Sequence, residues 1–151
     1  MSKLTHVDDQ GRAKMVDVGA KPAQRRIARA HGNIVLSGEA SRQVAENKNK
    51  KGDVLGVAQL AGIQAAKRTP ELIPLCHPLI LDKIDVQLTQ VGDQVVATSE
   101  VSCVGRTGVE MEALTAVSVA LLTVYDMCKA IDRNMRIGDI HLVSKEKHDV
   151  E

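Results

Sequence analysis

The chain has 151 residues, enough for one domain with its own hydrophobic core and too few for two domains of ordinary size. Its 20 basic and 19 acidic side chains nearly cancel, which argues against overall charge steering the protein to nucleic acid or to an anionic membrane. Aromatic residues make up 1% of the chain, so the core must be aliphatic and nucleobases have few rings on which to stack.

The cysteines and the hydrophobic runs predict a soluble protein of the cytoplasm. Cys76, Cys103 and Cys128 form no C-x-x-C pair, and no signal peptide is visible in the polar N-terminal residues, so we expect reduced thiols. The longest uncharged run is about 13 residues, short of the roughly 20 that a membrane-spanning helix needs. We therefore expect no membrane partner.

The first third of the chain is expected to contain an arm and then a strand. Residues 1–13 are polar and predict a flexible N-terminal arm, followed by a single domain over residues 14–151. Apolar residues between positions 25 and 37 favour an extended segment, and Gly32 with Asn33 interrupts it in the manner of a β-bulge.

Two helices and a basic loop should follow. Residues 39–47 predict the first helix, and residues 48–52 form a loop rich in lysine. Asp53 is a good N-cap for a second helix over residues 54–68, which we expect to stop near Pro70.

The second half of the chain predicts a β-hairpin, a long helix and a last strand. Residues 83–91 and 95–104 favour strands on either side of a turn at Gly92 and Asp93. Residues 105–131 are expected to form one apolar helix, and residues 138–143 a final strand before a charged tail. This order predicts an α+β fold of the ferredoxin-like split βαβ type, with an antiparallel sheet packed on helices.

The long helix carries charged residues at both ends of its apolar middle. Asp126 and Lys129 are three residues apart and share a helix face, so they form either an ordinary surface ion pair or a desolvated pair suited to acid–base work. Glu112 lies 14 residues before Asp126, which is about 21 Å along a helix. If both ends are functional, either each serves a different part of the site or a partner subunit brings its opposite end alongside, as in a symmetric oligomer.

Two further segments offer candidate binding groups. Glu112 stands in the first turn of the helix, where it either complements the helix dipole or accepts hydrogen bonds from a guanine-like N–H edge. Cys76 and His77 lie in a loop between two prolines, where His77 is either structural or a hydrogen-bond donor or proton carrier. Adjacent residues seldom both ligate a metal, and His6, His31, His141 and His148 show no spacing that would complete a site, so no bound metal is expected.

Basic residues cluster locally despite the balanced total. Lys51 precedes Gly52 and a helix start, a setting suited to holding a phosphate. Lys67 and Arg68 follow at the end of the same helix, and Arg26 belongs to an arginine cluster ahead of it. Such runs are usually solvated faces, and the alternative is phosphate recognition.

Seven segments of the chain together resemble a known family. They are LTH at residues 4–6, MVDV at 15–18, KGDV at 51–54, AGIQAAKRT at 61–69, LIPLCHP at 72–78, TGVEMEALT at 107–115 and YDMCK at 125–129. With these segments the chain resembles the cyclic pyranopterin monophosphate synthase family of molybdenum cofactor biosynthesis, the MoaC or C-protein family. The tail after Lys145 lacks the Gly- and Lys-rich extension of some members.

The resemblance implies a ferredoxin-like subunit in a hexamer, built as a trimer of dimers with a site at the dimer interface. It implies a lyase that converts 3',8-cyclo-7,8-dihydroguanosine 5'-triphosphate into cyclic pyranopterin monophosphate and pyrophosphate. By the same resemblance Asp126 and Lys129 are catalytic, Lys51 assists, and the substrate is contacted by Leu75, Cys76, His77, Met111 and Glu112.

Physical roles for these residues can be argued from the reaction itself. An Asp and Lys pair in a dry pocket can serve the proton transfers of ring opening and reclosure, with Lys129 as general acid and Asp126 as its partner or base. Lys51, Lys67, Arg68 and Arg26 are expected to neutralise the pyrophosphate that leaves. No acidic cluster in the sequence demands a protein-bound ion, so no cofactor is expected to be required. Mg²⁺ can nevertheless accompany the triphosphate.

Two other interpretations remain open from the sequence. The chain could be a non-catalytic ferredoxin-like nucleotide-binding module, although the missing aromatics and neutral charge count against RNA. It could also be an assembly module in which Asp126 and Lys129 form an interface ion pair, which would add little net stability.

Overall fold

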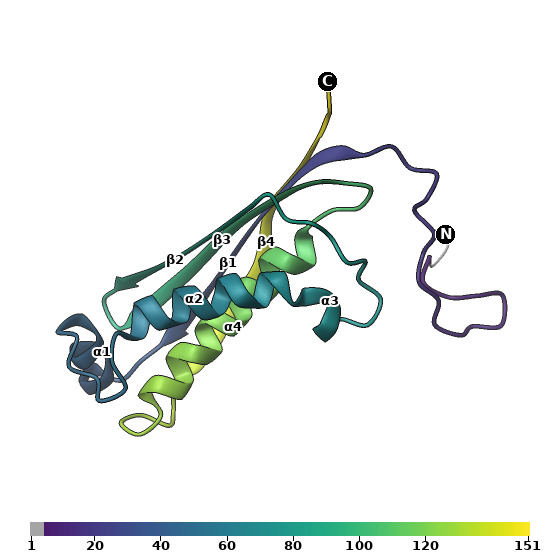
Figure 1. Ribbon diagram of the computed structural model, residues 1–151. Coiled ribbons are helices and arrows are strands. Elements are labelled where there is room, and N and C mark those ends of the chain that lie inside the picture. Colours follow the sequence, from purple (N-terminus) through teal and green to yellow (C-terminus); the bar gives the residue numbers. More distant parts are fainter. Residues whose placement is uncertain (1–4) are drawn as a thin grey trace.

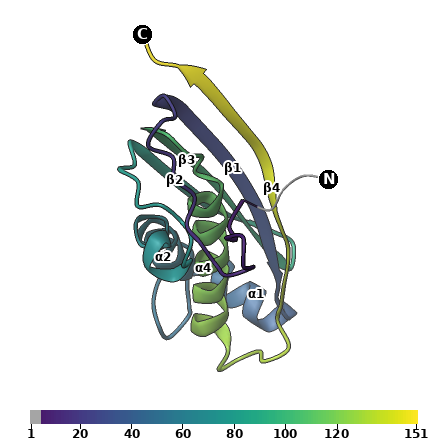
Figure 2. The same cartoon turned by 90° about the vertical axis from the view of Figure 1, so that its right-hand side faces the viewer.

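A four-stranded antiparallel sheet forms one layer of the computed structural model, which describes residues 5–151 (Figure 1). Helices α2 and α4 lie side by side against one face of this sheet (Figure 2). The strands are β1 (Gln24–Val35), β2 (Lys83–Val91), β3 (Gln94–Gly105) and β4 (Arg136–Asp149), and the helices are α1 (Gly38–Ala45), α2 (Val54–Lys67), α3 (Thr69–Leu72) and α4 (Glu110–Cys128). The sheet order β2-β3-β1-β4 confirms the predicted ferredoxin-like arrangement.

Local capping residues fix where the two helices after β1 begin. The Ser37 side chain accepts a hydrogen bond from the Ala40 backbone nitrogen at 3.2 Å, and Asp53 does the same for Gly56 at 3.1 Å. The predicted helices over residues 39–47 and 54–68 are thus confirmed to within two residues at each end. The second helix stops just before Pro70, as predicted, and this proline lies in the first turn of α3, where its missing N–H costs nothing.

The hairpin and the bulge also follow the sequence. Strands β2 and β3 meet at Gly92 and Asp93, and Gly92 adopts a φ of 58°, which glycine reaches without steric cost. The pairing of β1 with β4 shifts register between His31 and Asn33, which confirms an irregularity at the predicted interruption.

Two predicted elements differ from the structure at both ends. The long helix begins at Glu110 rather than at position 105, because Gly105 still pairs with Gln24 and ends β3, and it ends at Cys128 rather than at position 131. The last strand runs from Arg136 to Asp149 rather than over residues 138–143. Its charged half pairs with β1 at the edge of the sheet, where both faces of the strand tolerate polar side chains.

Small residues let the layers approach closely. The core between helices and sheet is rich in alanine and valine, with Ile34 and Leu121 the largest fully buried side chains. A Cβ on Gly62 of α2 would stand 2.9 Å from the backbone oxygen of Ala116 in α4, so glycine is required for this helix contact. Helix α4 is long and apolar enough to cross a membrane by composition, but 56% of its most apolar window is buried in the protein, as in a core helix.

Candidate active site

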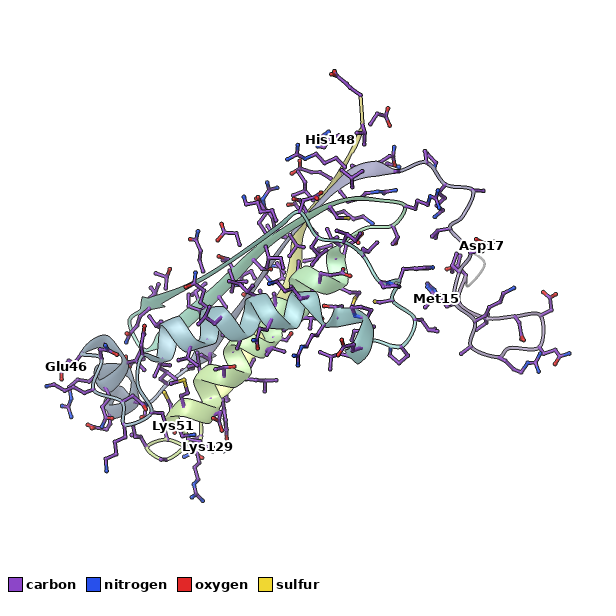
Figure 3. The ribbon with its side chains drawn as sticks, in the orientation of Figure 1. Met15, Asp17, Glu46, Lys51, Lys129 and His148 are labelled. Atoms are coloured by element: carbon purple, nitrogen blue, oxygen red, sulfur yellow. The ribbon has the colours of Figure 1, made fainter. Side chains whose placement is uncertain are left out.

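The C-terminal end of α4 carries a cluster of two lysines around one carboxylate. Lys129 Nζ lies 2.8 Å from Asp126 Oδ1, and Lys51 Nζ lies 3.1 Å from Asp126 Oδ2. Lys51 Nζ also donates to the Asp126 backbone oxygen at 2.9 Å. Figure 3 shows Lys51 and Lys129 converging at this end of the helix, although they come from distant parts of the chain.

A buried asparagine positions Lys51. Asn49 is 8% exposed, and its side-chain amide donates to the Met127 backbone oxygen at 3.0 Å. Its side-chain oxygen accepts from the Lys51 backbone nitrogen at 2.9 Å. The loop before α2 is therefore tied to the end of α4. Sequence reasoning missed Asn49, because nothing in a polar loop signals that one amide will be buried.

The side chains of this cluster are exposed to solvent in the single chain. The side chains of Asp126, Lys129 and Lys51 are 57%, 53% and 46% exposed, so in the isolated subunit the pair matches the surface ion pair, the first of the two alternatives given by the sequence. Hydrogen bonds from Lys129 and then from Lys51 lower the pKa of Asp126 below its ordinary value. Asp126 is consequently an ionised group with two cationic neighbours rather than a carboxyl poised to titrate near neutral pH.

A shallow cavity of about 300 Å³ adjoins the two lysines. Its walls are Lys51, Tyr125, Lys129, Ala130 and Arg133. The Tyr125 hydroxyl donates to the Arg133 backbone oxygen at 3.1 Å and holds the loop after α4 in place. Three cations around one opening suit an anionic ligand. Arg133 was not among the predicted site residues, because it follows the helix in an irregular segment.

The N-terminal end of α4 borders a separate cavity of about 270 Å³. All five residues predicted there for substrate contact line this cavity: Leu75, Cys76, His77, Met111 and Glu112. Glu112 is 3% exposed, and burial raises its pKa, with a smaller contribution from the charge of Glu110. Burial also raises the pKa of the Cys76 thiol, which is further disfavoured as a thiolate by the nearby Glu112.

The N-terminal segment lies over this cavity. His77 Nε2 lies 2.7 Å from the Val16 backbone oxygen, so Nε2 donates a hydrogen bond to this carbonyl. Thr5, His6, Val16 and Val18 join the cavity wall. Part of the arm predicted over residues 1–13 thus forms the cavity, while Met1 to Leu4 lie outside the described residues.

Arg26 borders a third cavity, of about 250 Å³, which shares Gly108 and Glu110 with the cavity at Glu112. Lys145 and Lys147 of β4 line the same cavity together with Glu110, and Lys147 pairs directly with Arg26 across the strands. The Arg26 Nε atom is buried without a hydrogen-bond partner in the described part of the chain. Sequence reasoning missed both lysines, although their alternation with Glu146 is the period of a strand.

The structure does not bring every predicted residue together. Lys67 and Arg68 are exposed at the C-terminal end of α2, and they line none of the three cavities above. The cavity at Lys129 shares no residue with the cavity at Glu112. Met15 and Asp17 likewise lie far from Lys51 and Lys129 (Figure 3). One subunit therefore presents two separate groups of candidate site residues at opposite ends of α4.

Comparison with known proteins assigns the chain to a family. A model of the MoaC family matches residues 15–148. A cyclic pyranopterin monophosphate synthase of Rhodospirillum rubrum is 59% identical over 144 residues, covering 94% of this chain and 87% of the relative. A protein of the same name from Roseiflexus sp. (strain RS-1) is 56% identical over 147 residues, covering 96% and 93%. Molybdenum cofactor biosynthesis protein 1 of Drosophila melanogaster is 55% identical over 146 residues, covering 95% of this chain and 26% of its own length. The chain belongs to the MoaC family.

Proposed function

We propose that the protein is a cyclic pyranopterin monophosphate synthase of molybdenum cofactor biosynthesis. It converts 3',8-cyclo-7,8-dihydroguanosine 5'-triphosphate into cyclic pyranopterin monophosphate with release of pyrophosphate, and it acts in the cytoplasm. Relatives with this name cover nearly the whole chain. The observation that carries the proposal is the contact of Lys51, Asp126 and Lys129, which brings two ammonium groups and a carboxylate together from two distant segments.

The charges of this cluster favour particular roles. Lys129 is the general acid, because its ammonium carries the proton that ring opening and reclosure require. Asp126 has a lowered pKa, which makes it a weak base, so it acts as the partner that orients both lysines. Lys51 supplies a second cation beside the reacting atoms. Docking of substrate and a second subunit would remove water from the cluster and strengthen these interactions.

The buried end of the site holds the nucleobase. Glu112 is kept from water, and N–H donors of a guanine-like edge would offset the burial that now disfavours its ionised form. His77, Leu75, Cys76 and Met111 complete the wall around the base. The triphosphate requires cations, and Arg26 meets this need at the adjoining cavity. Lys67 and Arg68 would reach phosphates only from a neighbouring subunit, and Mg²⁺ would arrive with the triphosphate as part of the substrate.

A shared site needs more than one chain. Glu112 and Asp126 are 14 residues apart on α4, which is about 21 Å at 1.5 Å per residue and too far to enclose one nucleotide from one subunit. Exposed apolar side chains, including Leu60 of α2 and Leu122 of α4, provide surface that association would bury. We infer a homo-oligomer, a hexamer built as a trimer of dimers, with each site at a dimer interface. Light scattering should give a particle of six 16.3 kDa chains.

Turnover of the cyclic dihydro nucleotide tests the proposal. Incubation with the purified protein should release pyrophosphate and form the pterin product, followed by chromatography. Lys129→Ala should abolish turnover and leave the oligomer intact. Lys48→Ala is the matched control, because Lys48 stands in the same basic loop but pairs with Glu46 and should leave turnover unchanged.

The other interpretations predict different results. A nucleotide-binding module would bind the substrate and form no product, and an assembly module would do neither. Full activity of Lys129→Ala would overturn the assignment of the general acid while leaving the reaction itself in place.

A further inference from the structure

A group of three side chains outside the proposed site gathers at the β1–β4 edge. His31 of β1 and His141 of β4 are direct cross-strand partners, with ring centroids 5.3 Å apart. Asp139 lies two residues before His141 on the same strand. One ligand atom from each of the three residues lies within 4.8 Å of the other two. We propose that His31, Asp139 and His141 bind a divalent transition-metal ion of the zinc class.

The distances from the Asp139 carboxylate to the two imidazoles fit coordination better than they fit hydrogen bonds. Asp139 Oδ2 lies 3.5 Å from His31 Nδ1, and Asp139 Oδ1 lies 3.4 Å from His141 Nδ1. Good N–H···O hydrogen bonds are shorter, between about 2.7 and 3.2 Å. Two ligand atoms each about 2.1 Å from a tetrahedral zinc ion stand roughly 3.4 Å apart. The gaps around the carboxylate are therefore of the size that one metal ion spans.

The backbone aims the aspartate into this position. Asp139 adopts a φ of 54°, in the left-handed region that favours glycine, at the register shift where β4 fits one more residue than β1. The neighbouring Ile140 points to the helix side, close to where a Cβ on Gly32 would lie. His31 and Asp139 are consequently left on the other face of the sheet. A bulge that turns a carboxylate toward two imidazoles preorganises a ligand set.

The ligand types specify the class of ion. Two imidazole nitrogens and one carboxylate oxygen suit zinc and its first-row neighbours, whereas Mg²⁺ and Ca²⁺ prefer oxygen ligands. The side chains of His31, His141 and Asp139 are 26%, 50% and 60% exposed, so an ion and a completing water can enter. His141 Nδ1 now faces the Asp139 backbone oxygen at 2.8 Å, and coordination would replace this hydrogen bond. The bound ion would cross-link β4 to β1.

Zinc titration of the full chain, purified without a histidine tag, tests the site. Calorimetry with ZnCl₂ should give one ion per chain, and zinc should raise the melting temperature of the protein. His31→Gln and His141→Gln should each lower the affinity by at least about tenfold, because loss of a ligand should cost no less than loss of an outer partner. Asp139→Asn should also weaken binding while keeping a residue type that tolerates the left-handed conformation.

Two controls separate this site from other zinc-binding groups. His148→Gln removes another exposed histidine of β4, one that lies beside Glu146, and should leave the affinity unchanged. Cys76→Ser removes the partly exposed thiol next to His77 and should also leave the zinc affinity unchanged. Cobalt bound at the proposed site should show tetrahedral absorption without a thiolate charge-transfer band. Zinc binding that survives His31→Gln and His141→Gln, or that is lost in Cys76→Ser, would overturn the proposal.

Discussion

Two inactive variants should restore activity to each other if the ends of α4 belong to different halves of one site. Lys129→Ala removes the proposed acid at the C-terminal end, and Glu112→Gln removes the buried carboxylate at the N-terminal end. The two positions are 17 residues apart, which is about 26 Å at 1.5 Å per residue, and their cavities share no residue. Each variant alone has a defect in every site of its oligomer, so each alone should be inactive.

The expected recovery follows from random assembly. In an equal mixture, the subunit that supplies the Lys129 end of a site is intact at Lys129 half the time. The subunit that supplies the Glu112 end is intact at Glu112 half the time. About one quarter of the sites are therefore complete, and turnover should reach about one quarter of the wild-type rate per chain.

Coexpression of the two variants with different tags, followed by purification and the pyrophosphate assay, measures this recovery. Native mass spectrometry confirms that mixed oligomers have formed. The control pairs Lys129→Ala with Asp126→Ala, because both changes lie at the same end and no mixed site is complete. Mixed oligomers of Lys129→Ala and Glu112→Gln without activity would refute the shared site.

Three further predictions concern pKa values and packing. Burial raises the pKa of Glu112 above 4.5 in the folded chain, so the folded state binds more protons and the free energy of unfolding falls as pH rises from 4.5 to that raised value. Glu112→Gln avoids this loss. In urea unfolding, the free energy of unfolding of the variant should exceed that of wild type by an amount that grows across this pH range and is absent below it. Gly62→Val should destabilise the folded protein by roughly 1–3 kcal/mol, because the new side chain meets the α4 backbone. Gly38→Ala should not destabilise it, because the space around Gly38 is open. Equal melting temperatures of the two variants would contradict this prediction. Lys51→Met removes one of the cations that lower the pKa of Asp126, so the acid limb of the residual pH–rate profile should move to higher pH, and an unchanged limb would exclude the coupling.

Features that depend on neighbouring residues could be predicted from the sequence. The Asp53 cap and the hairpin turn at Gly92 depend only on residues a few positions away, and the structure confirms both. The separation of Glu112 from Lys129 follows from helix geometry alone. The family resemblance supplied the roles that spacing leaves open.

Features that depend on long-range pairing could not be predicted in the same way. The second half of β4 has no apolar alternation, and only its pairing with β1 makes it a strand. His31 and His141 are far apart in the chain, so their meeting depends on strand register. The burial of Asn49 and the solvent exposure of Asp126 are likewise decided by how the loop before α2 packs on the end of α4.

The charged C-terminal half of β4 has a consequence for aggregation. It covers β1 along the edge of the sheet, where Lys145 pairs with Ala28 and Asp149 with Gln24. A chain cut after Ser144 would expose this row of unpaired backbone groups, which another strand could join. The alternating Lys and Glu side chains of the tail therefore protect against aggregation, because their charges disfavour β-pairing of the outermost strand with another chain.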